Sequence, residues 1–209
     1  AGRHAQSGVT LAYVFHLSNW LSLRGLEIPA LNHFWSLAVE EQFYLCWPLV
    51  VYLCGRKNLT RVALLMVAGA PMLRYVLLDH YTHSLATRAA YALTPARVDT
   101  LAMGALMAIA LRDDRWRAWL ARHAPRIIAF CVATLLVWFA AKTRLGLDRP
   151  AAVALLTSLL ALTFGLVVFH AAVSGAPGTG ISRILRLQPL QFSGRVSYAA
   201  YVIHFPLFV

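Results

Sequence analysis

Residues 33–53 read HFWSLAVEEQFYLCWPLVVYL, an apolar run that contains two adjacent glutamates. A helix needs about 20 mostly apolar residues to cross a bilayer, and this run is long enough. A charged group inside such a run costs about 2.5–3.5 kcal/mol on insertion scales, so it marks a candidate functional site. We therefore expect a membrane-spanning helix here whose first half carries the chemistry.

The composition of the whole chain supports a membrane protein. Its 209 residues are 60% hydrophobic and only 13% charged, with a formal net charge of +11. A soluble domain carries about 25% charged residues, so this composition excludes a disordered chain and argues against an ordinary soluble fold. The basic residues fall between apolar runs without interleaved aromatic residues, which indicates membrane topology rather than nucleic-acid binding. The expected partner is the lipid bilayer.

The apolar runs predict an all-α fold, a polytopic transmembrane helical bundle with about six spans. The predicted spans are Phe34–Leu53, Val62–Leu78, Val98–Leu111, Ile127–Ala141, Ala151–Val173 and Val196–Val209. The third span is short, and a weaker apolar stretch at Val9–Leu23 is compatible with either the tail of a preceding span or an interfacial segment.

The positive charges orient these spans. The loops around residues 54–61, 112–126 and 174–195 contain eleven lysines and arginines, whereas the loops around 79–97 and 142–150 contain five. Since cytoplasmic loops are enriched in lysine and arginine, the first set is predicted to be cytoplasmic. The start of the first span and the loop Asp79–Ala96 then lie on the outer side.

Helical periodicity separates the two glutamates. At about 100° per residue, one stripe of the helix contains His33, Ser36, Glu40, Phe43, Tyr44 and Trp47, and Glu41 lies about 100° away from it. Two interpretations are open for Glu40: a solvated group beside an interfacial aromatic belt, or an interior carboxylate that orients a catalytic base. Under the second interpretation, Ser36 and Tyr44 are positioned to hydrogen-bond Glu40.

Three ordered stretches resemble the signatures of one family. HFWSLAVEEQFYLCWPL, from His33, resembles the pattern [HN]xWSLxVEEQFYLxxPL of the acyltransferase 3 family of integral membrane O-acyltransferases. Residues Arg97–Gly104 (RVDTLAMG) are similar to its RxDxLxxG element, and Ser193–Pro206 (SGRVSYAAYVIHFP) to its G[RK]xSYxxYLxHxP element.

The resemblance implies an enzyme that moves a short acyl group, commonly acetyl from acetyl-CoA, onto a hydroxyl. Acceptors in the family are glycans, including the lipopolysaccharide O-antigen and peptidoglycan, or other molecules such as macrolides. The family domain has about ten helices, so residues 1–209 are expected to be a partial domain without the N-terminal helices and the C-terminal end. The proposed catalytic histidine and a preceding arginine lie in the first helix of the family domain, and none of the eight histidines here matches that motif.

The candidate catalytic residues are Glu40, Glu41, Ser36 and His204. Candidate substrate-binding residues are His33, Trp35, Tyr44, Arg74, Arg97, Ser197, Tyr198 and Tyr201. A sugar hydroxyl needs a general base, which Glu40 can orient, and the developing oxyanion needs donors, for which Arg97, Tyr198 and His204 are candidates.

Other roles remain open for several of these residues. Arg74 can pair with Glu40 or Glu41, bind a CoA phosphate, or reach the interface. Ser197, Tyr201 and His204 share a helical face, as polar residues turned inward would, although an aromatic belt explains the tyrosines equally well. No metal site is expected, because His80 and His83 have no third ligand at a suitable spacing.

The leading interpretation is a multi-pass O-acyltransferase of the bacterial inner membrane that uses acyl-CoA as a donor substrate, with no tightly bound cofactor. The alternative from another class is a transporter or flippase that uses intramembrane Glu and Arg as a relay. A third option is a membrane-embedded structural partner without chemistry.

Overall fold

A computed structural model describes residues 2–80, 84–145, 150–174, 180–204 and 207, and these residues form helices without any strand. The predicted all-α fold is therefore confirmed. The elements are α1 (Gly2–Val14), α2 (Ser18–Arg24), η1 (Pro29–Leu31), α3 (Phe34–Leu53), α4 (Arg56–His80), α5 (Ser84–Ala92), η2 (Thr94–Ala96), α6 (Val98–Leu111), α7 (Asp114–Leu145), α8 (Pro150–Val173), α9 (Gly180–Leu185) and α10 (Gln188–His204).

Each predicted span overlaps a helix, although α10 begins at Gln188 and not at the predicted Val196. The bounds of α3 and α6 are the predicted ones, whereas α4 and α7 extend beyond the apolar runs into the polar flanks. Within the described ranges, α4, α7 (Asp114–Lys142) and α8 are long and apolar enough to cross a membrane, and α6 is a shorter apolar helix. His83, Phe205, Pro206 and Val209 lie outside the described residues.

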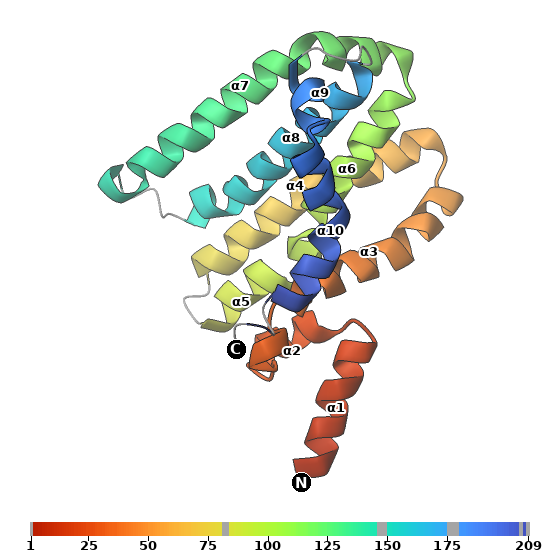
Figure 1. The fold of residues 1–209 in the computed structure, drawn as a ribbon. Coiled ribbons are helices and arrows are strands. Elements are labelled where there is room, and N and C mark those ends of the chain that lie inside the picture. Colours follow the sequence, from red (N-terminus) through yellow and green to blue (C-terminus); the bar gives the residue numbers. More distant parts are fainter. Residues whose placement is uncertain (1, 81–83, 146–149, 175–179, 205–206, 208–209) are drawn as a thin grey trace.

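Small side chains form the centre of the bundle. Helix α4 packs against α6 and α8, and α8 packs in turn against α7 (Figure 1). Ala63 and Ala70 of α4, Ala102 of α6 and Ala154 of α8 are almost completely buried. Alanine at such contacts lets helix backbones approach closely, which is how membrane helices gain packing energy.

Alternate loops lie at opposite ends of the bundle, as the predicted topology requires. The Arg56 guanidinium lies 3.2 Å from the Asp113 carboxylate, so the start of α4 meets the turn between α6 and α7. At the other end, Arg74 in the second half of α4 contacts Ala96 and Asp99 at the start of α6. We call this second end, which also contains the start of α3 and the end of α10, the outer end; the charge asymmetry predicts that it faces away from the cytoplasm.

The stretch Val9–Leu23 forms two helices with a sharp break between them. His16 has a positive φ of 53°, and α1 projects away from the bundle while α2 lies against α3 and α5 (Figure 1). Asn19 of α2 is fully buried; its amide donates to Ala92 O (3.3 Å) and Thr94 Oγ1 (3.1 Å) and accepts from Gln42 Nε2 (3.0 Å). This network fixes α2, α3 and η2 together at the outer end.

Candidate active site at the outer end

Four of the predicted site residues meet where α3 begins and α10 ends. The Tyr201 hydroxyl donates to the His33 carbonyl (2.8 Å), and the Ser36 hydroxyl contacts both that carbonyl and the Tyr201 oxygen. The His33 ring lies 5.2 Å from the Tyr201 ring and 5.0 Å from the His204 ring, centroid to centroid. We call His33, Ser36, Tyr201 and His204 the α3–α10 cluster. It joins segments about 165 residues apart in the sequence.

The surroundings of His33 favour a neutral imidazole. Burial lowers the pKa of His33 below its ordinary value of 6.5, and the nearby His204 acts in the same direction. Burial has this effect because removing water from the ring disfavours its charged form. A neutral imidazole can both donate and accept a hydrogen bond, as an acyl-transfer site requires.

The two glutamates of the motif have different environments, as the periodicity predicts. Glu40 is half-buried, whereas Glu41 is exposed. The prediction that Ser36 and Tyr44 hydrogen-bond Glu40 is wrong: Ser36 is engaged in the α3–α10 cluster, and the Tyr44 side chain is 55% exposed. Among the described residues, the Glu40 carboxylate has no hydrogen-bond or ion-pair partner. The Glu40 carboxylate is therefore available to a group from outside the described residues.

Gln42, the next residue of the motif, has a structural role. Its amide nitrogen donates to His16 O (2.7 Å) as well as to Asn19 Oδ1, and its carbonyl oxygen accepts from the Thr94 hydroxyl. These bonds use both of its N–H groups, so Gln42 positions the first half of α3 against α2 and η2.

The Arg97 guanidinium lies beside two aromatic rings that contact each other. Its guanidinium carbon lies 5.5 Å from the centre of the Trp35 ring and 5.6 Å from that of Tyr91, and these rings are 4.6 Å apart. In the part of the chain that the structure describes, the guanidinium has no hydrogen-bond acceptor or carboxylate partner. Cation–π contacts of this kind stabilise a cation while leaving its N–H groups available for an anion or oxyanion.

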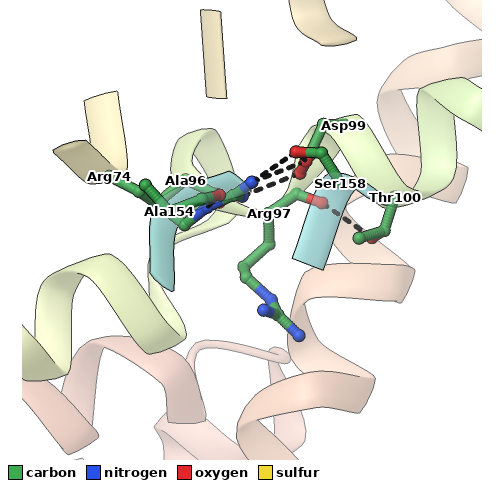
Figure 2. Close-up of polar contacts among 7 residues, drawn as sticks. All are labelled: Arg74, Ala96, Arg97, Asp99, Thr100, Ala154 and Ser158. Carbon is green, nitrogen blue, oxygen red and sulfur yellow. Dashed lines mark hydrogen bonds and ion pairs between the residues drawn. The ribbon is translucent and has the colours of Figure 1, made fainter. Parts of the chain in front are cut away.

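Arg74 is a structural residue, not a neighbour of the motif glutamates. Its Nη1 and Nη2 donate to the two oxygens of Asp99 at 2.9 and 2.7 Å, Nη2 also donates to Ser158 Oγ (2.7 Å), and Nε donates to Ala154 O (3.0 Å). A further bond from Nη1 to Ala96 O uses the fifth N–H. Figure 2 shows this arrangement, with Arg97 directed away from it.

This geometry corrects the expectations for Arg74. Pairing with Glu40 or Glu41 is wrong, because the partner is Asp99, and a guanidinium has only five N–H groups. With all five engaged and only 3% of the side chain exposed, none is left for a CoA phosphate or for the membrane interface.

Helix α6 is short for a membrane-spanning helix. Its 14 residues span about 21 Å at 1.5 Å per residue, whereas the hydrocarbon core is about 30 Å thick. Arg97 directly precedes this helix, at the end opposite to the Arg56–Asp113 contact.

The structure does not bring every predicted residue into the site. Tyr44, Ser197 and Tyr198 are exposed, and the Ser197 hydroxyl donates to Gly194 O in its own helix (2.9 Å). Of the two open interpretations, the inward-facing one therefore holds for Tyr201 and not for Ser197. Tyr201 alone of this pair contacts α3 and the residue before it.

Sequence reasoning missed the polar residues that support the site, namely Asp99, Ser158, Asn19, Gln42 and Thr94. Asp99 and Asn19 each stood out as a polar residue in or beside an apolar run, which is a usable signal. The carbonyl acceptors gave no such signal, because alanines contribute them: Ala92 accepts from Asn19, and Ala96 and Ala154 accept from Arg74.

Comparison with known proteins agrees with the motif resemblance. The acyltransferase domain of the acyltransferase 3 family matches residues 5–209. The chain is 29% identical to the putative peptidoglycan O-acetyltransferase YrhL of Bacillus subtilis, an alignment that covers 99% of this chain and 34% of YrhL. It is 26% identical to the O-acetyltransferase OatA of Staphylococcus aureus (95% of this chain, 34% of OatA) and 27% identical to the peptidoglycan O-acetyltransferase OatA of Listeria monocytogenes (93% and 31%).

The chain thus spans about a third of the length of these relatives. No solved structure matches it. Because the family match extends over nearly the whole chain and includes the α3, α6 and α10 motifs, the protein belongs to the acyltransferase 3 family.

Proposed function

We infer that the full-length protein is a multi-pass O-acetyltransferase of the bacterial cytoplasmic membrane, which moves acetyl from acetyl-CoA to a hydroxyl of an exported glycan. Family membership and the names of the three relatives support the reaction class. Two of the names specify peptidoglycan, which makes that polymer the first acceptor to test.

The observation that carries this inference is the Arg97 guanidinium beside the rings of Trp35 and Tyr91. When a hydroxyl attacks a thioester, negative charge develops on the carbonyl oxygen. A cation without a carboxylate partner, held in place by aromatic rings in a low-dielectric site, stabilises such an oxyanion without having to reorganise. Arg74, which is neutralised by Asp99, cannot act in this way.

The proposed step is a direct transfer. The acceptor oxygen bonds to the thioester carbonyl carbon while a general base takes the hydroxyl proton, and Arg97 stabilises the oxyanion. Collapse of this intermediate breaks the C–S bond. The CoA sulfur takes the proton from the base and leaves as a thiol, and the acceptor becomes an acetyl ester.

In this scheme Glu40 positions the base. Its half-buried carboxylate is available, and the family resemblance implies that the base is a histidine on the first helix of the family domain. A carboxylate at hydrogen-bond distance would hold that imidazole in one tautomer and stabilise its protonated form. His204 and Tyr201 border the same outer end of the bundle.

The test is acetyl transfer by membranes that contain the full-length protein. Radiolabelled acetyl-CoA is the donor, and label in the glycan fraction is measured for the wild type and for the Glu40→Gln, Glu41→Gln and Asp79→Asn variants. We expect Glu40→Gln to lower the rate at least about 100-fold at unchanged protein level, and exposed Asp79, outside the site, to be dispensable.

The other outcomes are equally informative. Loss confined to Glu41→Gln would move the positioning role to Glu41. Full activity of both glutamine variants would remove this role from α3. Absence of label with every variant and with the wild type would refute the proposed reaction and favour a transporter.

A further inference from the structure

A cavity adjoins the Trp35 and Tyr91 rings beside Arg97. It lies at the outer end between α2, the start of α3 and α5, with a volume of about 270 Å³, and its lining includes Ser22, Glu27, Asn32, Trp35, Arg88 and Tyr91. Trp35 and Tyr91 therefore border both the cavity and the Arg97 guanidinium. A molecule bound in the cavity would lie next to the proposed oxyanion site.

One wall of the cavity carries an unsatisfied acceptor. Glu27 Oε1 lies 3.6 Å from Arg88 Nη1, and Arg88 Nη1 also donates to Ser22 O (3.0 Å). Glu27 Oε2 is buried and has no hydrogen-bond partner among the described residues. Leaving such an oxygen unpaired costs free energy, so an arrangement of this kind is expected where a ligand supplies the donor.

The position of Arg88 in this wall depends on a glycine. Gly25 ends α2 in the left-handed conformation (φ 64°), and a Cβ there would lie 3.1 Å from Arg88 Nη1. Glycine adopts this conformation at no steric cost. The chain can therefore turn from α2 towards Glu27 while the Arg88 side chain passes alongside.

Aromatic rings and polar groups of this kind are complementary to a sugar. A pyranose has an apolar face of C–H groups, which packs on aromatic rings, and a rim of hydroxyls, which bind carboxylate, amide and guanidinium groups. The cavity is just below the range of about 300–1,000 Å³ typical of sites for drug-sized ligands, so it suits one ring of a glycan chain.

We propose that this cavity is the acceptor subsite and binds one pyranose ring of the glycan, with a sugar hydroxyl donating to Glu27 Oε2 and the ring packed against Trp35 and Tyr91. This assignment deepens the proposed function and rests on it for the identity of the acceptor. The bound ring presents another hydroxyl towards Arg97, and the outer end is the side on which an exported glycan is located.

The test measures binding separately from transfer. Full-length protein in nanodiscs is titrated with the disaccharide of N-acetylglucosamine and N-acetylmuramic acid, and the Kd is determined by saturation-transfer difference NMR. Glu27→Ala should weaken binding about 10- to 100-fold, the range expected for a hydrogen bond to a charged group. Asp79→Ala, which removes an exposed carboxylate outside the cavity, should bind as the wild type does.

A second pair of variants guards against misfolding of Glu27→Ala. The Tyr91 side chain is 59% exposed, so its replacement disturbs little packing. Tyr91→Phe, which keeps the ring, should retain binding, and Tyr91→Ala should weaken it by about tenfold.

The proposal is overturned if the wild type does not bind the disaccharide, if Glu27→Ala and Tyr91→Ala bind it as the wild type does, or if Asp79→Ala weakens binding equally. Selective loss of binding in Glu27→Ala and Tyr91→Ala supports it. If that pattern holds but the wild type transfers no acetyl group, the proposed reaction fails while the sugar subsite stands.

Discussion

Replacing Asp99 by asparagine removes the charge that compensates Arg74 in the centre of the bundle. The two side chains are 0% and 3% exposed, and both Asp99 oxygens accept from Arg74. Either orientation of the asparagine amide would therefore place its NH₂ group against a guanidinium N–H. Removing one partner of a buried ion pair costs about 3–5 kcal/mol, because the other charge is left uncompensated.

This cost should be visible in the thermal unfolding of the purified full-length protein in nanodiscs. At about 2–4 °C per kcal/mol for a domain of this size, we expect Tm to fall by about 6–20 °C. Asp113→Asn is the matched control: its ion pair with Arg56 is exposed, and such pairs contribute about 0–1 kcal/mol.

The double variant Arg74→Met/Asp99→Leu completes the experiment. Replacing both charges by apolar side chains removes the uncompensated charge, so part of the lost stability should return. The return is only partial because Ala96 O, Ala154 O and Ser158 Oγ lose the donor that Arg74 supplied. The reasoning is refuted if Asp99→Asn is no less stable than Asp113→Asn, or if the double variant is as unstable as Asp99→Asn.

Three further predictions concern the candidate site. Arg97→Ala should lower the initial rate of acetyl transfer about 100- to 1,000-fold, the usual cost of losing an oxyanion donor. Arg97→Lys should restore only part of the rate, because an ammonium lacks the planar fork of a guanidinium. An undiminished rate in Arg97→Ala would exclude Arg97 as the oxyanion donor. Tyr201→Phe should lower the free energy of unfolding by about 0.5–1.5 kcal/mol, because it removes the hydrogen bond to the His33 carbonyl. Tyr198→Phe, at an exposed position, should leave the free energy of unfolding unchanged. Equal effects of the two variants would contradict the observed contact. Because burial lowers the pKa of His33, its imidazole binds a proton at a higher pH in the unfolded chain than in the folded one, so the stability that the neutral ring contributes is present above pH 6.5 and is lost as the pH falls from 6.5 towards the lowered pKa. His33→Gln should therefore flatten that part of a profile of unfolding free energy measured between about pH 5 and 8. An unchanged slope would show that other groups cause it.

Much of the helical framework was predictable from local patterns. The apolar runs 34–53 and 98–111 coincide with α3 and α6, because Gly55 and Arg112 end the apolar pattern close to where each helix ends. The different environments of Glu40 and Glu41 also follow from position alone, since neighbours in a helix point about 100° apart. The motif at 33–49 was sufficient to predict the family, because it keeps residue types at fixed helical spacing.

The partners of the polar side chains were decided only by the tertiary structure. Nothing local distinguishes Asp99 from Glu40 as a partner for Arg74; the packing of α4 against α6 and α8 brings Asp99, Ser158 and two backbone carbonyls within reach, and it leaves Glu40 elsewhere. Likewise, the contact between His33 and Tyr201 depends on where α10 crosses the bundle. Sequence determines which residues are costly to bury because that cost belongs to the side chain, whereas the group that offsets it depends on which helices meet.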